Sequence, residues 1–62
     1  EPNNLKALAL GGTASFELGD FKKAEEYWTK AKNLVPADSE FARGMAENIA
    51  SAKAEAMNRS KK

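Results

Sequence analysis

The side chains that could do chemistry in this 62-residue chain are few, and their types exclude most catalytic centres. The sequence has no His and no Cys, which removes the usual general base, the thiolate nucleophile and the commonest metal ligands. Its Ser and Thr hydroxyls therefore have no imidazole to activate them. Glu25 and Glu26 are adjacent, but on a helix they would point about 100° apart, so they form no acid–base pair. We expect no enzyme, no metal site and no cofactor.

Two further patterns are incomplete as binding motifs. Gly11-Gly12-Thr13 lacks the rest of a phosphate-binding loop and the strand that precedes one. Arg59-Ser60-Lys61-Lys62 is basic but has no aromatic residues interleaved for stacking on bases. Ten basic and nine acidic residues leave a net charge of +1, which gives no field that would steer a nucleic acid. We therefore expect neither nucleic-acid binding nor direct membrane contact by this segment.

Hydrophobic periodicity predicts three helices, at about residues 5–18, 21–35 and 39–57. In the second and third segments, apolar residues recur every three or four positions, as on one face of a helix. These positions are Phe21, Ala24, Trp28, Ala31 and Leu34 (or Val35), followed by Phe41, Met45, Ile49 (or Asn48), Ala52 and Ala56. Residues 58–62 have no apolar anchor, so we expect them to form a disordered basic tail.

Capping residues stand at the ends of the predicted helices. Asn4 and Asp20 precede the first and second, where a side-chain oxygen can accept a free N–H of the first turn. Gly19 can end the first helix in the left-handed conformation. Either Asp38 or Ser39 can cap the third helix.

The glycine pair in the first segment is ambiguous, because each Gly costs a helix interior about 1 kcal/mol relative to Ala. The flanking stretches "LAL" and "TASF" would also fit a two-residue β-hairpin. The scarcity of β-branched residues and the frequency of Ala favour a helix. Gly11, Gly12 and Ser15 would then form a stripe of small residues. We expect the second helix to lie on this stripe with its backbone close, Ala24 providing a matching small residue.

An internal spacing points to a repeat. Pro2 and Pro36 stand 34 residues apart, and 34 residues with two helices per unit is the period of the tetratricopeptide repeat (TPR). The sequence resembles a TPR unit across residues 5–38. The matching residues are Gly12, Ala14, Phe16, Gly19, Asp20, Phe21, Ala24, Trp28, Ala31, Leu34 and Pro36. It departs at Gly11, where that family usually has a large aliphatic residue, and at Glu25, where an aliphatic residue is common.

The resemblance implies an all-α fold of the right-handed solenoid type. Residues 5–38 would form one helix-turn-helix unit, and residues 39–57 a capping helix or the first helix of a next repeat. Residues 1–4 would end a preceding repeat or cap. Trp28 would lie in the core.

A finer resemblance is to the TPR segment of bacterial c-type cytochrome biogenesis proteins of the CycH/CcmI type. The phrases that carry it are "NLKALAL", "GDF" with the later "YW", and "VPADSE" followed by "AR". It implies a periplasmic, membrane-anchored scaffold that holds apocytochrome c before haem attachment. A cytoplasmic location is the alternative.

The candidate binding residues lie on the side of the first helix that would line the concave groove of a TPR array. They are Lys6, Ala9, Leu10, Thr13, Phe16 and Glu17. A mostly apolar groove with a charge at each end suits the apolar face of an amphipathic helix. We therefore expect a non-catalytic protein-interaction module. Alternatively, Leu10 and Phe16 contact a neighbouring helix in the same chain, and the unit is purely structural or self-associates.

Overall fold

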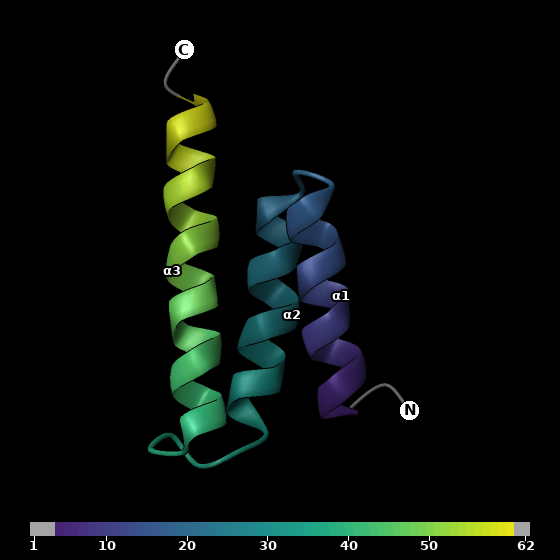
Figure 1. Cartoon of the computed structure of the whole chain (residues 1–62), viewed down its shortest axis with the longest axis vertical. Coiled ribbons are helices and arrows are strands. Elements are labelled where there is room, and N and C mark those ends of the chain that lie inside the picture. The colour runs from purple at the N-terminus through teal and green to yellow at the C-terminus, as the bar shows by residue number, and fades with distance from the viewer. Residues whose placement is uncertain (1–3, 61–62) are drawn as a thin grey trace.

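The computed structural model describes residues 4–60, and over this range the chain is all-helical with no strand (Figure 1). Helix α1 spans Leu5–Glu17, α2 spans Phe21–Asn33 and α3 spans Glu40–Ser60. The prediction of an all-α chain with three helices is therefore confirmed for residues 4–60. The glycine pair lies inside α1, so the hairpin alternative is wrong.

The predicted capping residues define where each helix begins. The Asn4 side chain accepts the N–H of Ala7 at 3.1 Å, and the Asp20 carboxylate accepts the N–H of Lys23 at 3.2 Å. Of the two candidates for α3, Ser39 is the cap, because its hydroxyl accepts the N–H of Ala42 at 3.2 Å.

Gly19 makes the turn between α1 and α2 possible. Its φ of 86° lies in the left-handed region that only glycine adopts without strain. Its N–H donates to the carbonyl of Phe16 at 3.0 Å, and the N–H of Asp20 donates to that of Ser15 at 2.8 Å. These bonds satisfy carbonyl groups at the end of α1 that have no partner within the helix.

Two helix ends differ from the sequence prediction. Helix α2 ends at Asn33, two residues before Val35. Helix α3 continues to Ser60, so a disordered tail beginning at residue 58 is wrong for residues 58–60. The physical reason is a tertiary contact, since the guanidinium of Arg59 lies 5.1 Å from the centre of the Phe21 ring, where a cation is attracted to the ring face. The rest of that tail, and residues 1–3 of the predicted N-terminal segment, lie outside the described residues.

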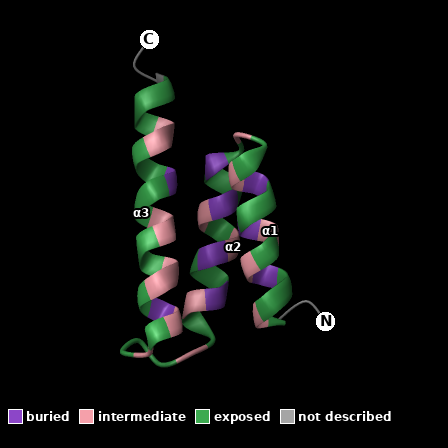
Figure 2. Cartoon of the chain, in the orientation of Figure 1, coloured by how far each residue is buried: buried purple, intermediate pink, exposed green. Residues whose placement is uncertain are grey.

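Helix α2 packs against both other helices and lies between α1 and α3 in Figure 1. The described fold measures 37 × 24 × 12 Å, so it is much thinner in one direction than in the other two. Helices α1 and α3 each pack against α2 from opposite sides. The buried residues accordingly gather along α2 and on the flanks of α1 and α3 that face it (Figure 2).

The glycine pair lets α1 accept two aromatic side chains of α2. A Cβ built on Gly12 would lie 2.3 Å from Nε1 of Trp28, and one on Gly11 would lie 3.1 Å from the Tyr27 ring. Trp28 is only 4% exposed. Its indole N–H donates to the Ala9 carbonyl at 3.2 Å, which gives the buried polar atom a partner.

The structure adds the identity of the side chains that meet the glycines. The small stripe on α1 faces α2 as predicted, and Ala24 is fully buried. The atoms nearest to the glycines are those of the Trp28 and Tyr27 rings. Large side chains seated on glycines give more buried area than two small surfaces in contact would.

Candidate interaction groove

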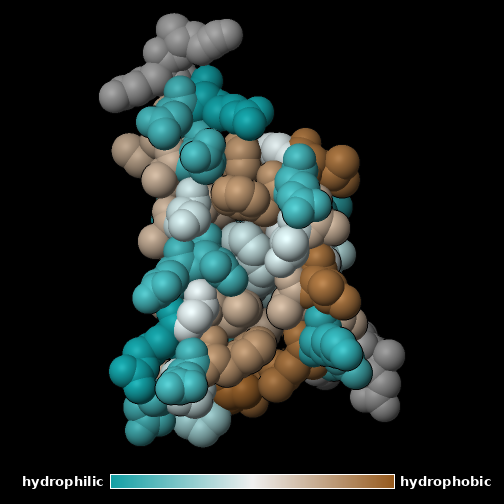
Figure 3. Space-filling model, in the orientation of Figure 1, coloured by the Kyte–Doolittle hydropathy of each residue, from teal (hydrophilic) through white to brown (hydrophobic). Residues whose placement is uncertain are grey.

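An open groove runs between α1 and α3, with a side chain of α2 at its base. Its volume is about 350 Å³. The lining residues are Thr13, Phe16 and Glu17 from α1, Trp28 from α2, and Asn48 and Ser51 from α3. The groove follows from the fold, because α1 and α3 flank α2. Figure 3 shows pale and light-brown side chains between a mostly hydrophilic flank over α3 and a flank over α1 that carries both hydrophilic and hydrophobic side chains.

Aromatic rings form the floor of the groove. The ring centres of Phe16 and Trp28 lie 5.9 Å apart, and those of Phe16 and Phe21 lie 5.2 Å apart with the planes at 71°. Both separations fall in the range favoured by aromatic pairs. Trp28 is held on its other edge by Gly12 and the Ala9 carbonyl. The floor is therefore apolar and pre-formed, as binding surfaces usually are.

Polar side chains form the two rims. Thr13 and Glu17 stand one turn apart on α1, and Asn48 and Ser51 stand three residues apart on α3. The Thr13 hydroxyl donates to the Ala9 carbonyl at 3.1 Å, which leaves the Thr13 oxygen free to accept a further hydrogen bond. Glu17 supplies the one formal charge among the lining residues. The groove thus offers an apolar strip with hydrogen-bonding groups on each side.

The structure separates the six predicted site residues into three groups. Thr13, Phe16 and Glu17 line the groove. Ala9 contributes only its carbonyl, which accepts from Thr13 and Trp28. Lys6 and Leu10 are exposed and do not line it.

The contribution of α3 was missed by sequence reasoning. Asn48 and Ser51 of α3 line the groove, whereas the predicted binding residues all lie on the first helix. The predicted 34-residue period offers a signal for one of them, since Ser51 lies 34 residues after Glu17. Both residues border the groove, one from each side.

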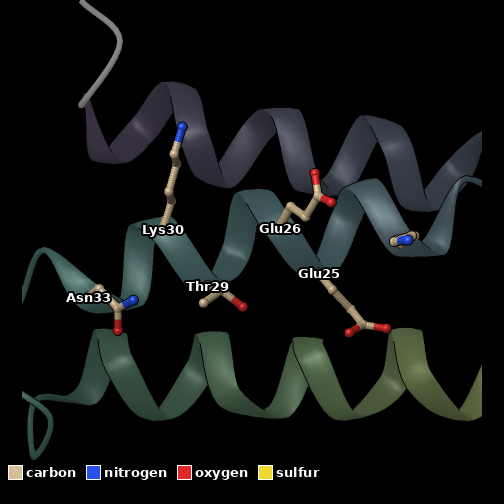
Figure 4. A pocket seen from close by; sticks show the side chains of 6 residues that line it. Glu25, Glu26, Thr29, Lys30 and Asn33 are labelled. Carbon is tan, nitrogen blue, oxygen red and sulfur yellow. The ribbon is translucent and has the colours of Figure 1, made fainter.

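The opposite, outward face of α2 carries charges rather than an apolar floor. Figure 4 shows Glu25 pointing towards α3 and Glu26 towards α1, so the two carboxylates diverge as expected. A shallow depression there is lined by Lys22, Glu25, Glu26, Thr29, Lys30 and Asn33. This mixture is typical of a solvated helix face.

The part of the chain that the structure describes holds no cluster of acidic, His or Cys side chains that could bind a metal. None of its helices combines the length and the apolar character needed to cross a bilayer. Comparison with protein-family models, with curated proteins and with solved structures found no match to this chain.

Proposed function

We propose that this chain is a non-catalytic protein-interaction module of the TPR type, which binds a segment of a partner protein in the groove between α1 and α3. The observation that carries the proposal is the composition of that groove, with Phe16 and Trp28 as an apolar floor between two polar rims. Its two hydroxyl side chains, Thr13 and Ser51, have no imidazole to activate them, and Glu17 is the one carboxylate among the lining residues. Binding is therefore the activity that its residues support best.

The order of helix contacts supports a repeat protein. In a solenoid each repeat packs on its sequence neighbours, and the fold extends in one direction. Here α2 packs against both α1 and α3, the helices that precede and follow it in the sequence. The 34-residue spacing relates Leu8 to Ala42, and both are buried. The helix starts, Leu5 and Glu40, differ by 35 residues, one more than the repeat.

An amphipathic helix is the partner segment that suits this groove. Its apolar side would rest on Phe16, and its polar flanks would meet Thr13 and Glu17 on one side and Asn48 and Ser51 on the other. Helix-in-groove recognition uses this division between apolar anchors and polar edges. Apocytochrome c, held in the periplasm before haem attachment, is the specific partner implied by the resemblance to the CycH/CcmI type.

The test is a titration of the ¹⁵N-labelled chain with synthetic amphipathic helices, including one from an apocytochrome c. The Trp28 indole N–H resonance reports on the floor, because Trp28 lines the groove and its N–H is held by the Ala9 carbonyl. We expect shifts at Trp28, Phe16 and Ser51.

Two threonine variants distinguish the groove from the rest of the surface. Thr13→Arg places a long charged side chain on the rim of the groove, whereas Thr29→Arg makes the same change on the outward face of α2 (Figure 4). Thr13→Arg should weaken binding about tenfold or more and Thr29→Arg should leave it unchanged. Equal effects of the two variants, or no response to any helix, would refute the proposed function.

A further inference from the structure

Helix α1 is apolar on a second face that the fold leaves uncovered. Its only charged residues are Lys6 and Glu17. Away from α2 and the groove, Ala7, Leu10, Ala14 and Leu18 recur along one edge, and all four are exposed, Leu10 by 62% and Leu18 by 85%. Figure 3 shows hydrophobic side chains along this outer edge of α1. A helix that is apolar beyond its packed face normally has a second partner.

The edge is self-complementary in size. Its order is small, large, small, large, at residues 7, 10, 14 and 18. When two such edges run antiparallel, Leu10 lies opposite Ala14 of the second copy, and Leu18 lies opposite Ala7 of the second copy. Each leucine then fills the space above an alanine, which is the alternation that well-packed interfaces use.

The charges beside the edge are complementary in the same arrangement. Lys6 and Glu17 are separated by three turns, about 16 Å, so they stand on the same side of α1 but cannot pair within one chain. Neither makes an ion pair within the described residues. A twofold axis perpendicular to two antiparallel helices keeps both charges on one side. It therefore brings Lys6 of each copy next to Glu17 of the other.

We propose that the occupant of this edge is a second copy of the chain, with the two α1 helices packed antiparallel about a twofold axis. This contact is isologous, so it closes as a dimer and does not propagate. The groove floor of Phe16 and Trp28 lies on the other side of α1 and stays open. Glu17 borders both surfaces, but the dimer needs no partner segment in the groove, so its test uses no ligand and its outcome is separate from that of the function proposed above.

Charge exchange tests the pairing directly, by sedimentation equilibrium of the full 62-residue chain. Lys6→Glu gives a homodimer with two facing acidic pairs, and Glu17→Lys gives one with two facing basic pairs. Each variant alone should raise the dimer dissociation constant about tenfold at low salt. An equimolar mixture should restore dimers, because in the heterodimer both contacts are again Lys with Glu. High salt should reduce all these differences.

A leucine variant and its control test the apolar edge. Leu10→Asp should abolish the dimer, whereas Met57→Asp, an equally drastic change at a residue of α3 that is 67% exposed, should leave it intact. Unchanged far-UV circular dichroism confirms that both variants fold. The proposal is overturned if the unaltered chain is monomeric at about 1 mM, which would leave the edge to a different protein or helix. It is also overturned if Met57→Asp disrupts the dimer as strongly as Leu10→Asp does, or if an equimolar mixture of the two charge variants forms no more dimer than either variant alone.

Discussion

Replacement of Gly12 by alanine tests the packing on which the fold and the groove both depend. Elsewhere in a helix, Gly→Ala stabilises by about 1 kcal/mol, because alanine loses less backbone entropy on folding. At Gly12 the new Cβ would lie 2.3 Å from Nε1 and 2.5 Å from Cδ1 of Trp28. Real Cβ atoms do not approach so closely, and therefore the indole or the whole of α2 must move.

The cost of that movement exceeds the gain in helix propensity. Overpacking of a core costs about 1–3 kcal/mol, and loss of the hydrogen bond from Trp28 to the Ala9 carbonyl costs about 1 kcal/mol more. Subtraction of the propensity gain leaves a net destabilisation of about 1–3 kcal/mol. A chain of this length has a free energy of unfolding of about 3–9 kcal/mol in all, so the effect is large.

Gly44→Ala is the matched control, because Gly44 also lies inside a helix but has nothing within 4 Å of its Cβ position. It should raise the free energy of unfolding by about 0.5–1 kcal/mol. Urea denaturation of both variants, followed by circular dichroism and by Trp28 fluorescence, measures the two effects. If Gly12→Ala stabilised the chain as much as Gly44→Ala does, the seating of Trp28 on Gly12 would be disproved.

Three further substitutions test contacts that hold the helices in place. Trp28→Phe removes the indole N–H that reaches Ala9, so the urea midpoint should fall by the equivalent of about 1–2 kcal/mol; an unchanged midpoint would show that this bond adds nothing. Asp20→Ala removes the α2 cap and should cost about 1 kcal/mol in a thermal melt, whereas Asp20→Asn should cost little; equal losses would argue against capping. Arg59→Ala removes the cation over the Phe21 ring and about 0.5–1 kcal/mol with it. Amide exchange in the last turn of α3 should then accelerate, and exchange as slow as in the unaltered chain would contradict that anchoring role.

The sequence by itself determined the helices and most of their ends, because the signals for these act within a few residues. Asn4 and Asp20 cap as predicted, since a capping side chain reaches only the next turn. Gly19 adopts its positive φ because the turn between two helices needs a residue without a Cβ. The three- and four-residue spacing of apolar side chains likewise marked which face of α2 is buried.

Only the tertiary structure decided what each face meets. The rotation of one helix about its axis against another depends on contacts between residues far apart in the chain, such as Trp28 with Gly12 and Arg59 with Phe21. No pattern within a few residues of sequence determines this angle of rotation. The packing of the helices against one another placed aromatic rings over the glycines and extended α3 through residues 58–60. The same packing brought Ser51 to the groove and left Leu10 outside it. The periodicity of apolar residues in the sequence specifies the buried face of a helix, whereas the side chains that fill the space between two such faces specify the site.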